Sequence, residues 1–318
     1  MITPHRDEVI ENIKECAQWG KLNDKVEVDD PVLSEEEKKE LVLNWNRNRK
    51  TADYRKKNQF AKGLLNLVAY FVNLSTRFKG LDNIREVSGG AIITSNHFNP
   101  LDNTAILRMA QKAGKKRLFI VSEETNFAMK GIIGFFMKYT NTIPITTDRE
   151  YMEKDFYPYM QEQLQKGEYV LLYPEQEMWF NYRKPRPPKR GAYYFAAKMQ
   201  VPIISCFVEI RDMPPKEAPK FHWVRYVVHV LKPIYPDPKK SIRENSVAMM
   251  NRDYEQKKDA YERAYHKPLV YDFYDEDIAG WIPEPQNKRR KNSVQKGCQI
   301  TQKSRKSAAQ KSGRKQNS

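Results

Sequence analysis

The stretch AIITSNHFNPLDNTAILRMAQ, residues 91–111, contains a change from strand to helix around which the rest of the chain can be arranged. Ala91–Ser95 is a short apolar run, which predicts a buried strand, and Asp102–Gln111 predicts a helix. Asn99 is a good N-cap, and Pro100 suits the first helical position. We therefore expect a tight strand-to-helix turn between the two elements.

That turn separates His97 from Asp102 by four residues. In one continuous helix their side chains would lie about 140° apart and could not share a proton. A helix that begins between them lets the carboxylate reach the imidazole, which can then take a proton from a hydroxyl. No serine or cysteine beside His97 is an obvious nucleophile, so the hydroxyl would belong to a substrate. The alternative is that Asp102 complements the helix N-terminus and His97 is an ordinary loop residue.

Beyond this turn, short strand patterns alternate with helical ones, which predicts a mixed, mostly parallel α/β sheet flanked by helices. The strands are expected at Ala91–Ser95, Arg117–Val121, Ile143–Thr146, Tyr169–Tyr173, Pro202–Val208 and Trp223–Leu231. The helices are expected at Asp102–Ala113, Lys130–Tyr139, Tyr151–Gln165 and Gly191–Met199. Because Trp223–Leu231 alternates strongly in polarity, it predicts a more exposed, antiparallel strand.

Composition divides the chain into three parts. Residues 1–52 predict a charged, helical N-terminal extension, in which Ser34–Glu37 forms a capping box. Residues 53–285 predict the main folded domain, and residues 286–318 predict a disordered basic tail with eleven Lys and Arg. Because residues 286–318 contain no Asp or Glu, the tail contributes +11 of the net charge of +16, which leaves +5 for residues 1–285. It could be a solvated terminus, or it could be attracted to an anionic membrane surface or to nucleic acid.

Cysteine usage and hydropathy exclude several classes of protein. Cys16, Cys206 and Cys298 are far apart and odd in number, which argues against a disulfide framework or a zinc site and suits a reducing cytosol. The charged N-terminus is not a signal peptide, and no run of eighteen apolar residues predicts a transmembrane helix. Leu64–Leu74 is long enough for a core helix or for one lying in a membrane interface, and its pattern does not separate the two.

Several blocks occur in a characteristic order around the strand-to-helix turn. They are Gly80–Ile84, Asn96–Asp102, Asn141–Arg149, Leu171–Glu177, and Gly191-Ala192 followed by Val201–Ile204. This order resembles the phospholipid/glycerol acyltransferase family, which includes the lysophosphatidic acid acyltransferases, over about residues 60–235. Members of that family carry Asn-His-x-x-x-x-Asp, Ile-Pro-Val-Asp-Arg-like, Phe-Pro-Glu-Gly-Thr and Val-Pro-Ile-x-Pro blocks.

The resemblance implies a glycerol-3-phosphate acyltransferase-like fold and an O-acyltransferase that needs no metal or organic cofactor. His97 would be the general base for an acceptor hydroxyl, and Asp102 would orient it. The residues expected to bind substrate are Asn96, Arg149, Glu175, Gln176, Arg183 and Lys189. Arg149 would hold the acceptor's phosphate, and its alternative is a surface salt bridge with its neighbours Asp148 or Glu150. The alternative for Glu175 is a solvent-facing carboxylate.

The chain also departs from the family's blocks. Gln176-Glu177 replaces Gly-Thr after Glu175, and Met178-Trp179 stands where the family has an arginine. A basic loop, Arg183–Arg190, follows at once. It would supply the lost positive charge to an anionic headgroup, or it would be a solvated loop that touches membrane lipids.

The sequence thus predicts an enzyme peripheral on the cytoplasmic, inner face of a membrane. It would move a fatty acyl group from acyl-CoA or acyl carrier protein to a lysophospholipid, with lysophosphatidic acid as the leading acceptor and phosphatidic acid as product. Another lysophospholipid or a glycolipid is the alternative acceptor. A catalytically silent lipid-binding protein, or one that binds nucleic acid through its basic tail, is the alternative of a different class.

Overall fold

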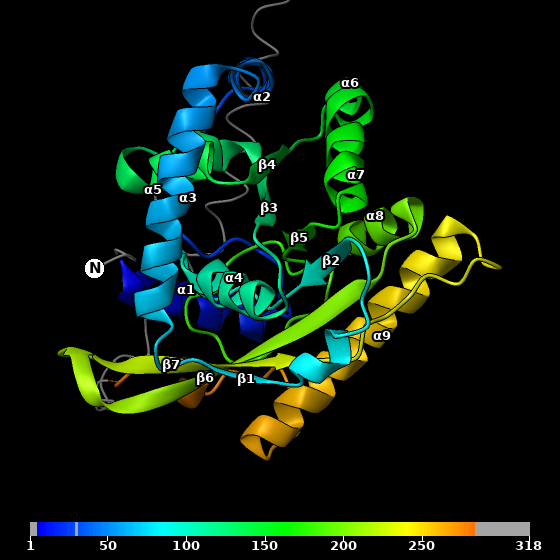
Figure 1. Ribbon diagram of the computed structural model, residues 1–318. Helices are drawn as coiled ribbons and strands as arrows, with labels where there is room; N and C mark the ends of the chain where they lie inside the picture. Colours follow the sequence, from blue (N-terminus) through cyan, green and yellow to red (C-terminus); the bar gives the residue numbers. More distant parts are fainter. Residues whose placement is uncertain (1–4, 29–30, 284–318) are drawn as a thin grey trace, which may run out of the picture.

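A seven-stranded sheet forms the centre of the computed structural model, which describes residues 5–28 and 31–283 (Figure 1). The strands are β1 (Arg77–Lys79), β2 (Ala91–Thr94), β3 (Leu118–Glu123), β4 (Thr142–Ile145), β5 (Tyr169–Leu172), β6 (Ile203–Ala218) and β7 (Phe221–Val230). Their order across the sheet is β1-β7-β6-β2-β5-β3-β4. Strands β2 to β6 run parallel to one another, while β7 runs antiparallel to β6. The predicted α/β class and the antiparallel strand are confirmed.

Helices precede, connect and follow these strands. They are α1 (Arg6–Gln18), α2 (Glu35–Asn48), α3 (Ala52–Val72), α4 (Asp102–Lys112), α5 (Gly131–Tyr139), α6 (Arg149–Tyr151), α7 (Tyr157–Gln165), α8 (Gly191–Met199) and α9 (Ile242–Tyr265). A π-helical turn, Met152–Phe156, joins α6 to α7. The helices predicted after β2, β3 and β4 and before β6 are confirmed, as is the capping box at Ser34 that begins α2.

Alternate residues of the central strands face two separate layers of helices. Ile93 of β2 and Leu171 of β5 lie in one apolar cluster, to which α3 and α4 contribute. Their neighbours Ile92 and Val170 lie in a second cluster with residues of α2, α7 and α8. Burial on both faces explains why these strands are continuous apolar runs.

The register of the central strands brings distant parts of the sequence to one edge of the sheet. β2 pairs with β5 in parallel, and Thr94 lies opposite Leu172. His97 follows Thr94 by three residues, and Glu175 follows Leu172 by three residues. The loops that carry the predicted blocks therefore leave the sheet side by side.

The N-terminal helices are part of the packed structure. Val9, Ile10 and Ile13 of α1 are fully buried, and their cluster includes Trp179 and Phe221. The predicted extension is therefore helical as expected, but the apolar face of α1 covers the loop that follows β5.

The sequence patterns did not predict α9 or the full length of β6. The 24-residue α9 contacts α8 and β6, and Figure 1 shows it running beside the sheet. Strand β6 continues to Ala218, well beyond the expected end at Val208, because it pairs with β7 in a long hairpin.

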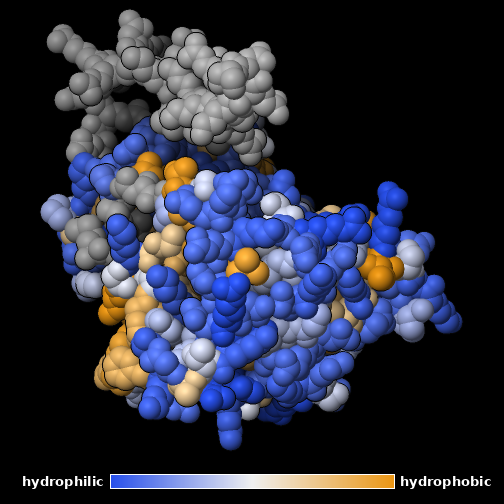
Figure 2. Space-filling model, turned by 90° about the horizontal axis from the view of Figure 1, so that it is seen from above, coloured by the Kyte–Doolittle hydropathy of each residue, from blue (hydrophilic) through white to orange (hydrophobic). Residues whose placement is uncertain are grey.

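Apolar side chains remain exposed on α3 and α5. Phe60, Leu67 and Phe71 of α3 and Ile132 of α5 are each more than half exposed, whereas Leu65 packs against the core. Figure 2 shows apolar side chains gathered along one side of the molecule, where Figure 1 places these two helices. The helix predicted to be either a core helix or an interfacial one thus has a packed side and an exposed apolar side. None of the helices within the described residues is sufficiently long and apolar to span a membrane.

The predicted basic tail, residues 286–318, and Cys298 lie outside the described residues.

Candidate active site

His97 and Asp102 meet in the turn that follows β2. Nδ1 of His97 lies 2.8 Å from Oδ2 of Asp102. The imidazole is 22 % exposed, whereas the carboxylate is buried. A carboxylate at Nδ1 fixes the tautomer of the ring and leaves Nε2 as the nitrogen that can accept a proton. The predicted spatial pairing is therefore present, and its role in catalysis stays a prediction.

The carboxylate of Asp102 also holds the turn itself. Its Oδ2 accepts hydrogen bonds from the backbone N–H groups of Phe98 at 2.9 Å and Asn99 at 3.3 Å. The predicted cap is wrong in detail, because α4 begins at Asp102, with Leu101 at the N-cap position. The side chain of Asn99 instead accepts from the backbone N–H of Leu101 at 3.0 Å, which makes a local turn of Asn99-Pro100 and delays the helix.

Tyr173, the last residue before Pro174, lies against both members of the pair. Its ring stacks on His97, with 3.9 Å between ring centroids, and its hydroxyl donates to Oδ1 of Asp102 at 2.5 Å. Burial raises the pKa of Tyr173 well above its ordinary value, and the neighbouring carboxylate of Asp102 raises it further. Tyr173 is therefore protonated and acts as a hydrogen-bond donor.

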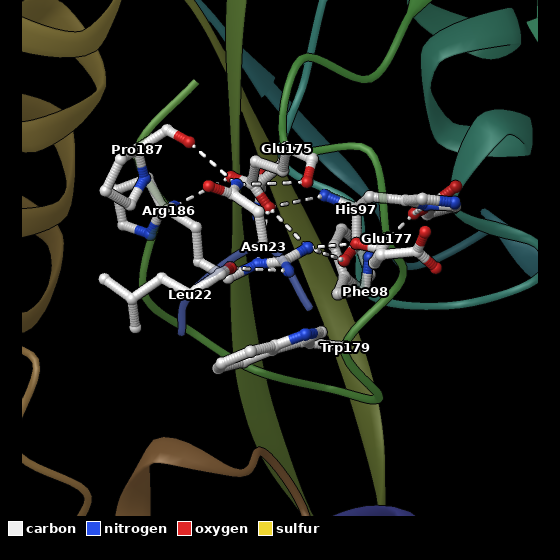
Figure 3. Close-up of polar contacts among 12 residues, drawn as sticks. Leu22, Asn23, His97, Phe98, Glu175, Glu177, Trp179, Arg186 and Pro187 are labelled. Atoms are coloured by element: carbon white, nitrogen blue, oxygen red, sulfur yellow. Dashed lines mark hydrogen bonds and ion pairs between the residues drawn. The ribbon is translucent and has the colours of Figure 1, made fainter. Parts of the chain in front are cut away.

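Glu175 is buried behind His97 and is paired with Arg186 (Figure 3). Its Oε2 lies 3.1 Å from Nε of Arg186 and accepts from the backbone N–H of His97 at 3.3 Å. Its Oε1 accepts from the backbone N–H of Arg186 at 2.9 Å. Neither sequence interpretation of Glu175 is supported, since the carboxylate neither faces solvent nor lies free for a substrate.

The backbone carbonyl of His97 is hydrogen-bonded, as its backbone N–H is. Its backbone oxygen accepts from the N–H of Trp179 at 3.1 Å, and the guanidinium of Arg186 lies over the Trp179 ring at 4.6 Å. Arg186 also donates to the carbonyl of Leu22, and Nδ2 of Asn23 donates to the carbonyl of Glu175 at 3.2 Å. The segment after α1 is thus hydrogen-bonded to the loop behind His97 and helps to fix its position.

Asn96 is also a structural residue. Its side chain donates to the carbonyl of Val208 at 3.1 Å and accepts from the N–H of Val208 at 2.8 Å. The side chain is almost completely buried. Asn96 therefore joins the end of β2 to β6, and the expectation that it binds substrate is corrected to this role.

The predicted solvated basic loop is largely an interior one. Arg183 donates to Asp212 at 2.6 Å and to the carbonyl of Glu276 at 2.8 Å, and its side chain is only 11 % exposed. Lys184 is paired at 2.5 Å with Asp277, with both side chains buried. Since the guanidinium of Arg183 is mostly buried and already paired with Asp212, the expectation that Arg183 binds a headgroup is corrected as well.

Three of the predicted substrate-binding residues are exposed. Arg149 lies at the start of α6 with its side chain 89 % exposed, and it pairs with Glu153 at 2.9 Å. Gln176 is exposed with a φ of 67°, in the position where the family block has glycine. Lys189 is exposed next to the start of α8. Among the described residues, none of these three side chains forms a hydrogen bond or ion pair with His97 or Asp102.

Sequence reasoning missed Tyr173 and Arg186, and the two differ in how they could have been found. Tyr173 lies directly before Pro174-Glu175 in a block that was recognised, so its hydroxyl was an available signal. Arg186 lies among Lys and Pro residues in a stretch that has the composition of a solvated loop. Nothing local marks it as the partner of Glu175.

The arrangement can perform general-base chemistry. It has a partly exposed imidazole, a buried carboxylate at Nδ1, and a rigid backbone held by Glu175 on the amide side. Within residues 5–28 and 31–283, no three His, Cys, Asp or Glu side chains are grouped so that they could hold a metal ion.

The chain has matches among known protein families and solved structures. Residues 75–209 match the model of the family described as Acyltransferase. Among solved structures, the chain is similar to the crystal structure of the 1-acyl-sn-glycerophosphate (LPA) acyltransferase PlsC from Thermotoga maritima. That match has 16% sequence identity and a TM-score of 0.44, and covers 73% of this chain and 90% of that chain. No curated protein matches. The segment that matches the Acyltransferase family, residues 75–209, includes both His97 and Asp102.

Proposed function

We propose that the protein transfers a fatty acyl group from acyl-CoA or acyl carrier protein to the hydroxyl of a lysophospholipid. Lysophosphatidic acid, which would become phosphatidic acid, is the acceptor that the sequence blocks favour. The observation that carries the proposal is the 2.8 Å contact between Nδ1 of His97 and Asp102, in a turn that keeps the imidazole partly exposed.

In the proposed reaction, Nε2 of His97 takes the proton of the acceptor hydroxyl as its oxygen attacks the carbonyl carbon of the thioester. Asp102 stabilises the resulting imidazolium through Nδ1. The tetrahedral intermediate then collapses, the carbon–sulfur bond breaks, and the imidazolium returns its proton to the leaving thiolate. The acceptor oxygen thereby gains the acyl group, and His97 is again neutral.

We propose that the exposed cations, Arg149 and Lys189, bind the acceptor's anionic headgroup. Guanidinium and ammonium groups both suit a phosphate. Their exposure supports this assignment, in contrast to Arg183, whose guanidinium is bonded to Asp212. The exposed Gln176, in the turn after Glu175, is the third candidate for contact with the acceptor.

The exposed apolar side chains of α3 and α5 support docking on a membrane surface. Phe71 and Ile132 are 60% and 65% exposed, and such side chains gain about 1.5–3 kcal/mol each when fully buried in an apolar phase. We propose that this face brings the enzyme to the cytoplasmic leaflet, where a lysophospholipid acceptor lies.

An acceptor screen with labelled acyl-CoA and acyl carrier protein, read by lipid mass spectrometry, tests the proposal. We expect the unmodified protein to acylate lysophosphatidic acid, and His97→Ala to lose at least 10²-fold in rate while remaining folded by circular dichroism. His222→Ala, which changes a histidine in β7, is the matched control and should keep full activity. Near-full activity of His97→Ala would contradict the assignment.

The same screen separates the remaining alternatives. Acylation of a different lysophospholipid or a glycolipid would keep the chemistry and change the acceptor, as the altered residues after Glu175 allow. No acylation of any acceptor would favour a silent lipid-binding protein. Nucleic-acid binding that is lost with residues 286–318 would make the tail an accessory element.

A further inference from the structure

Tyr173 contacts His97 and Asp102 in two different ways. Its hydroxyl donates to Oδ1 of Asp102 at 2.5 Å, which is a short, charge-assisted hydrogen bond. Its ring lies almost parallel to the imidazole of His97, with 13° between the planes and 3.9 Å between the centroids. One side chain therefore touches both the carboxylate and the ring that the carboxylate orients.

The two oxygens of Asp102 have separate partners. Oδ2 accepts from the backbone N–H of Phe98 and lies 2.8 Å from Nδ1 of His97, while Oδ1 accepts from Tyr173. With both oxygens engaged, the carboxylate cannot rotate without losing a charge-assisted hydrogen bond. The hydroxyl of Tyr173 thus fixes the plane of the carboxylate, and this plane sets the direction of the bond to Nδ1.

The stacked ring restrains the imidazole in the remaining direction. It covers one face of His97 and limits the rotation of the imidazole about its χ angles. Because burial and Asp102 keep the pKa of Tyr173 well above its ordinary value, the hydroxyl remains a donor.

We propose that Tyr173 is a positioning residue for the general base, with a ring that sets the plane of His97 and a hydroxyl that locks Asp102. The inference rests on the proposed function, because it concerns the same imidazole. The family block that this segment resembles has phenylalanine in this position, so the hydroxyl is what this chain adds.

Tyr173→Phe tests the hydroxyl while keeping the ring. The first readout is the far-downfield proton resonance of the Nδ1–H group of His97, identified by its absence in His97→Gln. We expect this resonance to move further downfield, because Asp102 without the Tyr173 donor is a stronger acceptor for Nδ1–H. The second readout is acyl transfer, in which kcat should fall about threefold to tenfold with an unchanged KM for the acceptor.

Tyr226→Phe is the matched control. Tyr226 is buried and packs edge-on against Phe98 at 5.3 Å. Burial and then the charge of Asp102 raise the pKa of Tyr226, but no hydrogen bond joins its hydroxyl to Asp102 among the described residues, so it controls for a nearby hydroxyl that is not bonded to the carboxylate. Tyr226→Phe should lower stability about as much as Tyr173→Phe does, but it should leave the resonance and kcat unchanged. Tyr173→Leu, which also removes the ring, should lower kcat further than Tyr173→Phe does.

The two readouts separate this inference from the proposed function. If Tyr173→Phe leaves the resonance and kcat as in the unmodified protein, or moves them no more than Tyr226→Phe, the positioning role is wrong. If the unmodified protein acylates no acceptor but the resonance still moves in Tyr173→Phe alone, the proposed function fails while the lock on Asp102 stands.

Discussion

The guanidinium of Arg186 lies 3.0 Å from the carboxylate of Glu175, and both side chains are almost completely buried directly behind His97. The pair joins two loops: Glu175 follows β5, and Arg186 comes eleven positions later, after the chain has passed around Trp179. Since Glu175 also accepts from the amide of His97, the position of the imidazole depends on a buried charge pair.

Breaking this pair should be strongly destabilising. Arg186→Met leaves the carboxylate of Glu175 buried without its partner, so we expect the free energy of unfolding to fall by about 3–5 kcal/mol in urea titrations. The double variant Glu175→Gln with Arg186→Met should recover part of that loss, since no buried charge remains. Arg117→Met, which breaks the partly exposed pair with Glu168, is the control and should change stability by about 1 kcal/mol or less. Equal losses in the single and double variants would contradict the buried-charge argument.

The central strands and their helices could be predicted because their burial follows simple periods. α9 could not, because its buried face is largely polar. Its buried residues include Asn245, Asp253 and Lys257, and Asp253 accepts from Thr94, Tyr193 and Lys257. A helix that packs through hydrogen bonds and an ion pair has no apolar stripe for a pattern to reveal.

Part of the site could also be predicted from the sequence, and part could not. His97 and Asp102 lie within one local turn, so the start of a helix was enough to predict their contact. Asn96, Glu175 and Arg183 were expected to bind substrate, but whether a polar side chain faces a cleft or the interior depends on long-range packing. Glu175 is buried because it pairs with Arg186. The composition of the Lys- and Pro-rich loop that carries Arg186 does not indicate that this charge is buried.

Replacing Gln176 with glycine should stabilise the folded protein. Its φ of 67° lies in the left-handed region, which costs about 1–2 kcal/mol for a residue with a Cβ, and its side chain is exposed. After allowing for the greater freedom of glycine in the unfolded chain, Gln176→Gly should raise the free energy of unfolding by about 0.5–1 kcal/mol. Gln200→Gly, at a φ of 53° after α8, should gain less, because Nε2 of Gln200 donates to the carbonyl of Ala197 at 2.7 Å, and Glu177→Gly should lower stability. A loss in Gln176→Gly would mean that the side chain holds the turn.

Glu209 should make stability depend on pH. Burial opposes its ionisation, but hydrogen bonds from His229 at 2.8 Å and from Arg211, together with their charge, outweigh burial and lower the pKa of Glu209. A lowered carboxyl pKa gives stability that is complete above the unfolded value of about 4.3 and is lost as pH falls through the folded value. Glu209→Gln should therefore be about 1–3 kcal/mol less stable at pH 7, with a difference that shrinks below about pH 4. Stability curves that stay parallel down to pH 3 would contradict this.

The exposed cations should act on acceptor binding without affecting the fold. Arg149→Ala and Lys189→Ala remove charges from exposed side chains, so we expect each to raise the acceptor's KM about threefold to tenfold with unchanged unfolding. Arg183→Ala should instead lower the free energy of unfolding and leave the acceptor's KM unchanged, because its guanidinium is only 11% exposed and donates to Asp212 and to the carbonyl of Ile210. An unchanged KM in both exposed variants would remove them from the acceptor site.

The apolar face of α3 should govern binding to lipid vesicles. Leu67 and Phe71 are 54% and 60% exposed on successive turns of α3, so replacing both with serine removes apolar surface while leaving the buried Ala69 in place. We expect the partition of Leu67→Ser with Phe71→Ser onto vesicles of anionic and zwitterionic phospholipid to fall at least tenfold. Val247→Ser on α9, which is 38% exposed on a different helix, is the control and should bind as the unmodified protein does. If the double variant and the control bind equally, this face does not dock the enzyme, because a membrane-facing helix cannot lose two apolar side chains without losing affinity.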